Sequence, residues 1–183
     1  PPNTVQKNIQ FIEPFMDHVR TVLEPSCGSC EYITALQERY ETIHITGIES
    51  NETIYESIKS LATDTLQLIH GDFLQYETDT KYDLIIGNPP YFVMKKKEVP
   101  ESYYDYFEGR PNIFILFIIK ALRLLNRNGI LSFVLPRNFL NCLYYDKTRR
   151  YILEHFHIVS IMECDDDYME TKQDTVMLIL QHN

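Results

Sequence analysis

The sequence predicts an α/β fold: a mostly parallel sheet of roughly seven strands, helices on both faces and an antiparallel hairpin at one edge. Apolar strand-like segments alternate with amphipathic helical segments, which is typical of parallel sheets covered by helices. The last two strand candidates have no convincing helix between them and therefore favour an antiparallel pair. With 183 residues, 44% of them hydrophobic and 23% charged, the chain is long enough for one such domain and too short for two.

The elements follow from apolar periodicity and from residues that end helices. Strands are predicted at residues 21–23, 43–48, 66–69, 84–86, 130–135, 158–162 and 176–180. Helices are predicted at residues 6–19, 31–40, 53–61, 111–125 and 144–156. Pro14 is expected to kink the first helix, and Asn128-Gly129 to cap the fourth at its C-terminus. Residues 91–110 are expected to form a long polar and aromatic loop.

Charge and cysteine content exclude several classes of function. The net charge is −9, so the chain alone lacks the positive field that sequence-independent nucleic-acid binding requires. The longest apolar run, residues 113–119, is far too short for a bilayer, and no signal peptide is visible, so we expect no membrane partner. Cys27 and Cys30 form a CxxC pair without a second pair at zinc-like spacing, so we expect no metal and reduced cysteines in an intracellular enzyme.

The most informative stretch is Asn88-Pro89-Pro90-Tyr91, at the carboxyl end of the fourth predicted strand. Ligands bind at this edge of open α/β sheets. The side-chain oxygen of Asn88 and the carbonyl of Pro89 are acceptors for the hydrogens of a planar amino group. Pro90 fixes Pro89 in an extended conformation, and Tyr91 offers a face for stacking. A stiff turn after a strand explains these residues equally well when they are taken alone.

Other strand ends carry ligand-like residues as well. The first predicted strand is followed by Glu24-Pro-Ser-Cys-Gly28, a loop that lets the backbone approach a ligand before a helix begins. Glu49 ends the second and is placed to bind a ribose diol. Asp72-Phe73, an acceptor and an aromatic ring, follows the third. One such acid is ordinarily a cap, but four ligand-like tips in sheet order indicate a binding site.

Together these motifs resemble the S-adenosylmethionine-dependent DNA adenine amino-methyltransferases with an Asn-Pro-Pro-Tyr turn, over essentially the whole chain. The resemblance implies a Rossmann-like class I methyltransferase fold and a single catalytic domain at residues 1–183. It implies S-adenosyl-L-methionine as the cofactor and DNA as a partner. The residues matched or placed near the cofactor are Thr4, Glu24, Pro25, Cys27, Gly28, Glu49, Ser50, Asp72, Phe73, Asn88, Pro90 and Phe117.

The family chemistry assigns roles to the catalytic turn. The target adenine is flipped out of the duplex, Tyr91 stacks on it, and Asn88 and Pro89 accept its 6-amino hydrogens. By position, Tyr168 is expected to hold the other edge of the base. The lone pair then attacks the sulfonium methyl directly, so catalysis rests on positioning and electrostatics, with Asn88, Pro89, Pro90, Tyr91 and Tyr168 as the catalytic set.

The sequence also departs from the family pattern. Cys30 stands where many relatives have a second glycine, and three aspartates, residues 165–167, precede Tyr168 and would repel DNA phosphates. No target-recognition domain is visible after the last strand. A truncated chain, a separate recognition subunit and a small enzyme that uses its 91–110 loop all explain this. The expected compartment is the cytoplasm of a prokaryote or, for a viral protein, the interior of the host cell.

Three alternatives stay open. The same chemistry serves RNA adenine or the glutamine amide of a release factor, although the Glu24-Pro-Ser-Cys-Gly28 loop favours the DNA group over the Asp-x-Gly-x-Gly loop of the glutamine enzymes. A non-catalytic subunit with this fold is the third alternative. It is disfavoured because Asn88, Tyr91, Glu49 and Asp72 are all intact.

Overall fold

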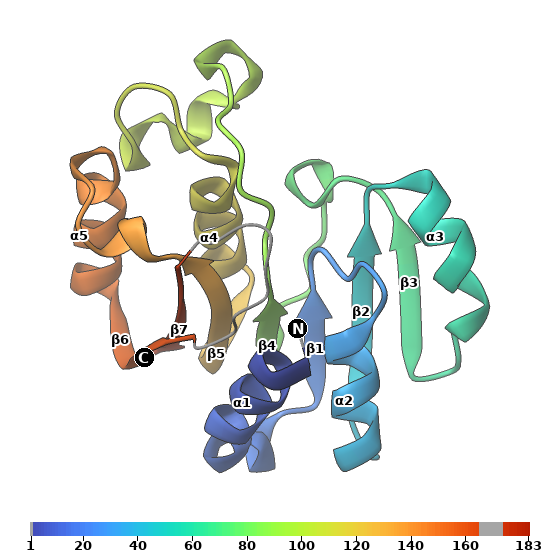
Figure 1. The fold of residues 1–183 in the computed structure, drawn as a ribbon. Helices are drawn as coiled ribbons and strands as arrows, with labels where there is room; N and C mark the ends of the chain where they lie inside the picture. The colour runs from blue at the N-terminus through green and yellow to red at the C-terminus, as the bar shows by residue number, and fades with distance from the viewer. Residues whose placement is uncertain (1, 165–173) are drawn as a thin grey trace.

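A computed structural model describes residues 2–164 and 174–183 of the chain. Within this part, a seven-stranded sheet runs in the order β3-β2-β1-β4-β5-β7-β6 (Figure 1). The strands are β1 Thr21–Glu24, β2 His44–Glu49, β3 Leu66–His70, β4 Tyr82–Gly87, β5 Leu125–Pro136, β6 Phe156–Glu163 and β7 Thr175–His182. Strands β1 to β5 pair in parallel, whereas β7 is antiparallel to both β5 and β6. The predicted fold class and the antiparallel edge are confirmed. Strand β7 lies between β5 and β6, so β6 is the edge strand.

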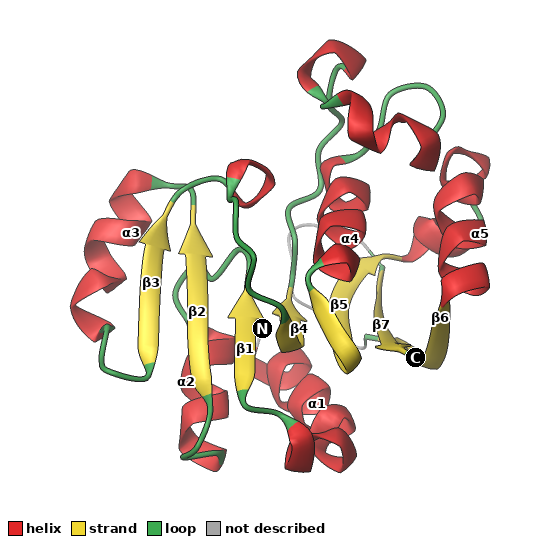
Figure 2. Ribbon diagram, turned by 180° about the vertical axis from the view of Figure 1, so that it is seen from behind, coloured by secondary structure: helices red, strands yellow, loops and turns green. Residues whose placement is uncertain are grey.

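Helices cover both faces of the sheet because neighbouring strand residues point to opposite sides. Val22 packs with α1 and α2, and Leu23 packs with α4; both are fully buried. This two-sided burial explains why the central strands are continuous apolar runs. The helices are α1 Pro2–Ile12, α2 Glu31–Arg39, α3 Glu52–Ile58, α4 Ile113–Arg123 and α5 Asp146–His155. Seen from behind in Figure 2, α4 and α5 lie on the side opposite α1 and α2.

The central helix α4 is the most apolar of the elements. Asn112 caps it by accepting the amide of Phe114, and the helix residues from 113 to 119 are all buried. One side packs on the sheet. Another side, with Leu116 and Ile119, packs on Val99 and Tyr103 of the segment before the helix. A helix that is apolar all round therefore has protein on several sides.

The predicted end of helix α4 and the predicted start of strand β5 are wrong. Helix α4 spans Ile113–Arg123 and ends with Leu124 as its C-cap, so Asn128-Gly129 does not cap it. The chain has already entered β5, where Leu125 pairs with Tyr82 before the register shifts. Asn128 adopts a φ of 68°, and a Cβ on Gly129 would lie 2.8 Å from the carbonyl oxygen of Asn126. Asn128 and Gly129 thus lie at an irregularity within strand β5, where the backbone also requires such residues.

The N-terminal helix and the long loop also differ from expectation. Helix α1 begins at Pro2, and the 3₁₀ helix η1 Glu13–His18 follows it, so Pro14 opens a new turn and does not kink a long helix. Residues 91–110 contain two 3₁₀ helices, Lys96–Glu98 and Glu101–Tyr106. We call residues 91–112 the arm; Figure 1 shows it projecting beyond the carboxyl ends of the strands.

The sheet order positions the site. The chain runs outward from β1 to β2 and β3, then returns to place β4 on the other side of β1. This reversal is the topological switch point at which open α/β sheets bind ligands, beyond the carboxyl ends of the strands.

Candidate functional site

Two adjoining pockets occupy the switch point, and we call them together the cleft. One, of about 200 Å³, lies between α1 and the loop after β1. The other, of about 350 Å³, extends along the ends of β2 and β3 towards α4. Ser26 and Asn88 line both pockets, so the two pockets adjoin at these residues. The residues predicted for the cofactor that line it are Thr4, Glu24, Pro25, Cys27, Gly28, Glu49, Ser50, Asp72, Phe73, Asn88, Pro90 and Phe117.

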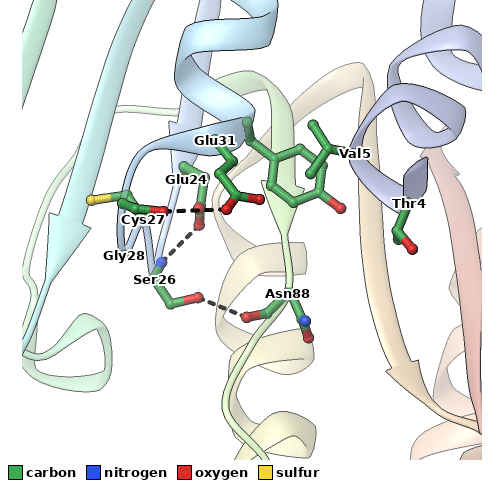
Figure 3. Close-up of a pocket in the computed structure, with 10 residues that line it drawn as sticks. Thr4, Val5, Glu24, Ser26, Cys27, Gly28, Glu31 and Asn88 are labelled. Atoms are coloured by element: carbon green, nitrogen blue, oxygen red, sulfur yellow. Dashed lines mark hydrogen bonds between the residues drawn. The ribbon is translucent and has the colours of Figure 1, made fainter. Parts of the chain in front are cut away.

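Glu24 ends β1 and is 3% exposed (Figure 3). Its Oε1 accepts the backbone amide of Ser26 at 2.8 Å. Burial raises the pKa of Glu24 to about 8, although the Ser26 amide opposes this shift. A Cβ at position 87 would lie 2.5 Å from Oε1, so Gly87 is required for this carboxyl to fit. A buried carboxyl lining a cleft is suited to a cationic ligand group, which would favour its ionised form.

Glu49 ties the end of β2 to the loop after β1. Its Oε1 accepts the amide of Gly28 at 2.8 Å, and its Oε2 accepts the amide of Asn51 at 2.9 Å. The amide of Cys27 also donates to the carbonyl of Ile48 at 2.9 Å. A carboxylate has about four acceptor positions, so two bonds leave Glu49 able to accept from a diol as well.

The loop after β1 contains the departure from the family pattern. Cys30, the N-cap of α2, has a φ of 68°, in the left-handed region that glycine adopts without strain. Its amide donates to the carbonyl of Cys27 at 2.8 Å, which closes a tight turn. Cys30 thus adopts a backbone conformation that glycine would adopt at lower cost. The Cys27 thiol donates a hydrogen bond to the Cys30 sulfur, which lowers the pKa of Cys30.

The end of β3 forms an aromatic wall with α4. Asp72 caps the 3₁₀ turn η3 Phe73–Gln75, and its Oδ1 accepts the amide of Leu74 at 2.9 Å. The rings of Phe73 and Phe117 lie 5.0 Å apart at an interplanar angle of 55°. Both rings line the cleft although each is less than 5% exposed. The wall offers an apolar aromatic surface with the carboxyl group of Asp72 beside it.

The turn after β4 holds an exposed amide at the junction of the two pockets. The backbone carbonyl of Asn88 accepts a hydrogen bond from Ser26 Oγ at 3.1 Å (Figure 3). Its side-chain Oδ1 lies 2.6 Å from the Tyr91 hydroxyl, which is also 2.6 Å from the carbonyl of Val134. One hydroxyl proton thus has two acceptors. The Tyr91 ring packs edge-on against Phe114, at 82° and 5.8 Å, and Pro89 is buried.

Comparison with known proteins places the chain in a family. Residues 6–169 match the model of the Eco57I restriction-modification methylases, which is most of the chain. The chain belongs to this family. It is 28% identical over 177 residues to the type II methyltransferase M.AccI of Acinetobacter calcoaceticus, covering 90% of this chain and 33% of the relative. It is 29% identical over 126 residues to a tRNA1(Val) (adenine(37)-N6)-methyltransferase of Actinobacillus pleuropneumoniae, covering 65% and 52%.

A solved structure shows the same fold. A putative class I S-adenosylmethionine-dependent methyltransferase from Listeria monocytogenes matches all of this chain and 60% of its own, with a TM-score of 0.82 and 18% identity. The class I methyltransferase fold expected from the sequence is confirmed, and S-adenosylmethionine is the cofactor of that fold. The chain spans between a third and about half of the two relatives described above.

Some lining residues were not predicted from the sequence. Ser26, Phe92 and Ile113 line the cleft, and Phe92 is 54% exposed. Ser26 lies inside the predicted loop, so its position was a usable signal. Phe92 directly follows the turn after β4, but nothing in its sequence context separates it from other loop aromatics. Tyr168 and the acidic run 165–167 lie outside the described residues.

The described residues give two further findings. Residues 2–164 and 174–183 contain no group of three or more histidine, cysteine, aspartate or glutamate side chains that could hold a metal ion. In the same ranges, no helix is both long enough and apolar enough to cross a membrane.

Proposed function

We propose that residues 1–183 act as a catalytic domain that transfers a methyl group from S-adenosylmethionine to the 6-amino group of adenine in DNA. The observation that carries this proposal is the position of Asn88. Its exposed amide lies at the junction of the two pockets, where the middle of an elongated cofactor would sit. An acceptor at the reacting centre is the feature that amine methylation needs most.

The residues that line the cleft support one direction for the bound cofactor. The methionine end would lie between Thr4 and the loop after β1, with its ammonium group near Glu24. The ribose diol would be bound by Glu49, with Ser50 beside it. The adenine would lie against the wall of Phe73 and Phe117, and its amino group near Asp72. Pro90 lines the same pocket and would contact the opposite side of the ring.

Methyl transfer then proceeds in one displacement. Asn88 Oδ1 and the Pro89 carbonyl would each accept a hydrogen bond from the amino group, which concentrates the lone pair on the nitrogen. Bound S-adenosylmethionine would supply the methyl group: the bond from nitrogen to the methyl carbon would form as the carbon–sulfur bond breaks, the bonding electrons would return to sulfur, and S-adenosylhomocysteine would be left. The methylated nitrogen then loses one proton to solvent. The contribution of the protein is positioning and the placement of acceptors.

Tyr91 must release Asn88 for this reaction. Its hydroxyl has one proton, and donating that proton to the Val134 carbonyl alone removes the donor from Asn88 Oδ1. The amide of Asn88 must then turn away from the Tyr91 oxygen, because two oxygens 2.6 Å apart repel when no proton lies between them. Tyr91 would then stack on the flipped base, as its ring is placed just after the turn. Tyr168 stays the proposed contact on the other edge.

DNA is favoured as the acceptor because the matching family is described as restriction-modification methylases. The tRNA relative, an (adenine(37)-N6)-methyltransferase, supports adenine as the base and RNA as the second candidate. A net charge of −9 favours additional DNA-binding surface from a recognition domain or subunit. An enzyme of this kind acts inside the cell, where its DNA is.

The test is methyl transfer from labelled S-adenosylmethionine to unmethylated DNA, structured RNA and a release-factor protein in parallel, with mass spectrometry of each product. We expect 6-methyladenine in DNA only. Methylated RNA or glutamine without methylated DNA would overturn the acceptor. Cofactor binding without any transfer would favour a missing recognition partner or a non-catalytic subunit over an independent enzyme.

A further inference from the structure

Lys120 of α4 contacts the segment that follows β3. It lies one turn after Phe117, so the two side chains share a helix face. Its Nζ donates to the carbonyl oxygen of Phe73 at 2.5 Å and also donates to the carbonyl of Tyr76. These carbonyls belong to the 3₁₀ turn η3 and its C-cap. One ammonium group therefore satisfies two acceptors of a turn that is distant in sequence.

The interaction is well suited to hold that turn. Hydrogen bonds from a charged donor are stronger than neutral ones, and a cation is favourable at the carbonyl end of a helical turn. The ammonium also lies 5.2 Å from the centre of the Phe73 ring, in a cation–π contact. Burial lowers the pKa of Lys120, and the carboxylate of Asp72 opposes this shift.

The turn held by Lys120 is the part of the cleft proposed for the cofactor adenine. Asp72 fixes its beginning through the amide of Leu74, and Lys120 binds the carbonyls of its first residue, Phe73, and of its C-cap, Tyr76. Phe73 is itself bound by Lys120, and its ring forms the aromatic wall with Phe117. Loss of the hydrogen bonds from Lys120 would let Asp72 and Phe73 shift together relative to α4.

We propose that Lys120 is a positioning residue that sets the affinity of the cleft for the adenosine half of S-adenosylmethionine. Lys120 lines neither pocket of the cleft, so we infer that it acts through Asp72 and Phe73 and not by contact with the ligand. The inference rests on the proposed function only for the identity of the cofactor and is independent of the methyl acceptor.

The test is calorimetric binding of S-adenosylhomocysteine to the whole chain. Lys120→Met keeps the aliphatic length and removes the charge, and we expect its Kd to rise about tenfold, because charged hydrogen bonds are lost. Lys120→Arg should recover most of the affinity. Lys81→Met is the matched control: Lys81 Nζ donates to the carbonyl of Arg123 at 2.6 Å, in the same last turn of α4 as Lys120, and neither Lys81 nor Arg123 lines the cleft.

The outcomes separate positioning from general stability. Weakened binding in Lys120→Met, with wild-type affinity in Lys81→Met and a similar Tm for both variants, supports the proposal. Wild-type affinity in Lys120→Met, or an equal loss in both variants, overturns it. Lys120→Gln replaces the methionine variant if the latter does not fold, because its shorter side chain cannot reach both carbonyls.

The wild-type chain distinguishes this proposal from the proposed function. If it binds S-adenosylhomocysteine but methylates no DNA, the result contradicts the proposed acceptor alone. If it binds no ligand, the result contradicts both proposals.

Discussion

The two sides of the cleft are held in place by different kinds of contact. On the side proposed for the cofactor, Glu24, Glu49 and Asp72 each accept a backbone amide close to the end of their own strand. On the side proposed for catalysis, Asn88 is exposed and is held through two hydroxyl groups, those of Ser26 and Tyr91. The first side is preorganised by the main chain, whereas the second can change its hydrogen bonds without a backbone movement.

This difference predicts that changes on the two sides affect separate quantities. Carboxylates tied to the main chain should influence cofactor affinity and stability together. The exposed amide should influence the chemical step and little else, because no other element depends on it for packing.

The largest expected effect comes from Asn88→Ala, which tests the catalytic side. We expect transfer to fall by about 10²–10³-fold or more, because an acceptor at the reacting amine is lost. The Kd for S-adenosylhomocysteine should remain close to that of the wild type. Single-turnover transfer and calorimetry measure the two quantities. An equal loss of both would show that Asn88 supports the cofactor and would remove the distinction between the two sides.

A second prediction concerns the charge of Glu24. The pKa is about 8 in the folded chain against 4.5 in the unfolded chain, so between these values the folded state binds more protons. The contribution of Glu24 to the free energy of unfolding should therefore be greatest below about pH 4.5. It should fall as the pH rises towards 8, by at most about 1.4 kcal/mol per pH unit.

Glu24→Gln is the matched variant, because its amide oxygen can still accept from Ser26 and its side chain does not titrate. Urea unfolding of both chains at intervals from pH 5 to 8 measures the effect. We expect a falling free energy of unfolding in the wild type and a flatter profile in the variant. Parallel profiles would mean that Glu24 is ionised in the folded chain throughout this range.

The third prediction tests the ribose site. Glu49→Ala removes a carboxylate and leaves the amides of Gly28 and Asn51 without their acceptor. We expect cofactor binding to weaken by about 10–100-fold, since hydrogen bonds to charged groups contribute about 1.5–3 kcal/mol. Glu52→Ala, an exposed position in the first turn of α3, is the control. Unchanged affinity by calorimetry in Glu49→Ala would remove this residue from the ribose role.

The same comparison explains which parts of the fold and of the candidate site could be predicted from the sequence. The strand ends at Glu24, Glu49 and Asp72 were found because short-range order decides them: a buried run ends, an acid follows, and parallel strands bring the ends together. The Asn128-Gly129 signal was misassigned because helix caps and strand irregularities require the same backbone conformation, and only long-range pairing with Tyr82 distinguishes them.

Long-range packing also explains what the sequence could not provide at the site. The contact of Tyr91 with Val134 joins residues 43 positions apart, and that of Lys120 with Phe73 joins residues 47 apart. The structure of the arm depends on Leu116 and Ile119 of a later helix. Local patterns carry no information on such pairs, so the positions of the side chains were predictable where the backbone alone sets them.

The smallest expected effect tests whether the cofactor loop carries strain at Cys30. A non-glycine residue in the left-handed region costs about 1–2 kcal/mol, and its side chain is fully buried. Cys30→Gly and Cys30→Ala both remove the sulfur, so the difference between them isolates the backbone. We expect the glycine variant to be more stable by about 1 kcal/mol, the reverse of the usual order within a helix. Equal stabilities by urea unfolding would mean that the loop relaxes around residue 30, and that its shape is set by the ties of Gly28 and Cys27 to β2 alone.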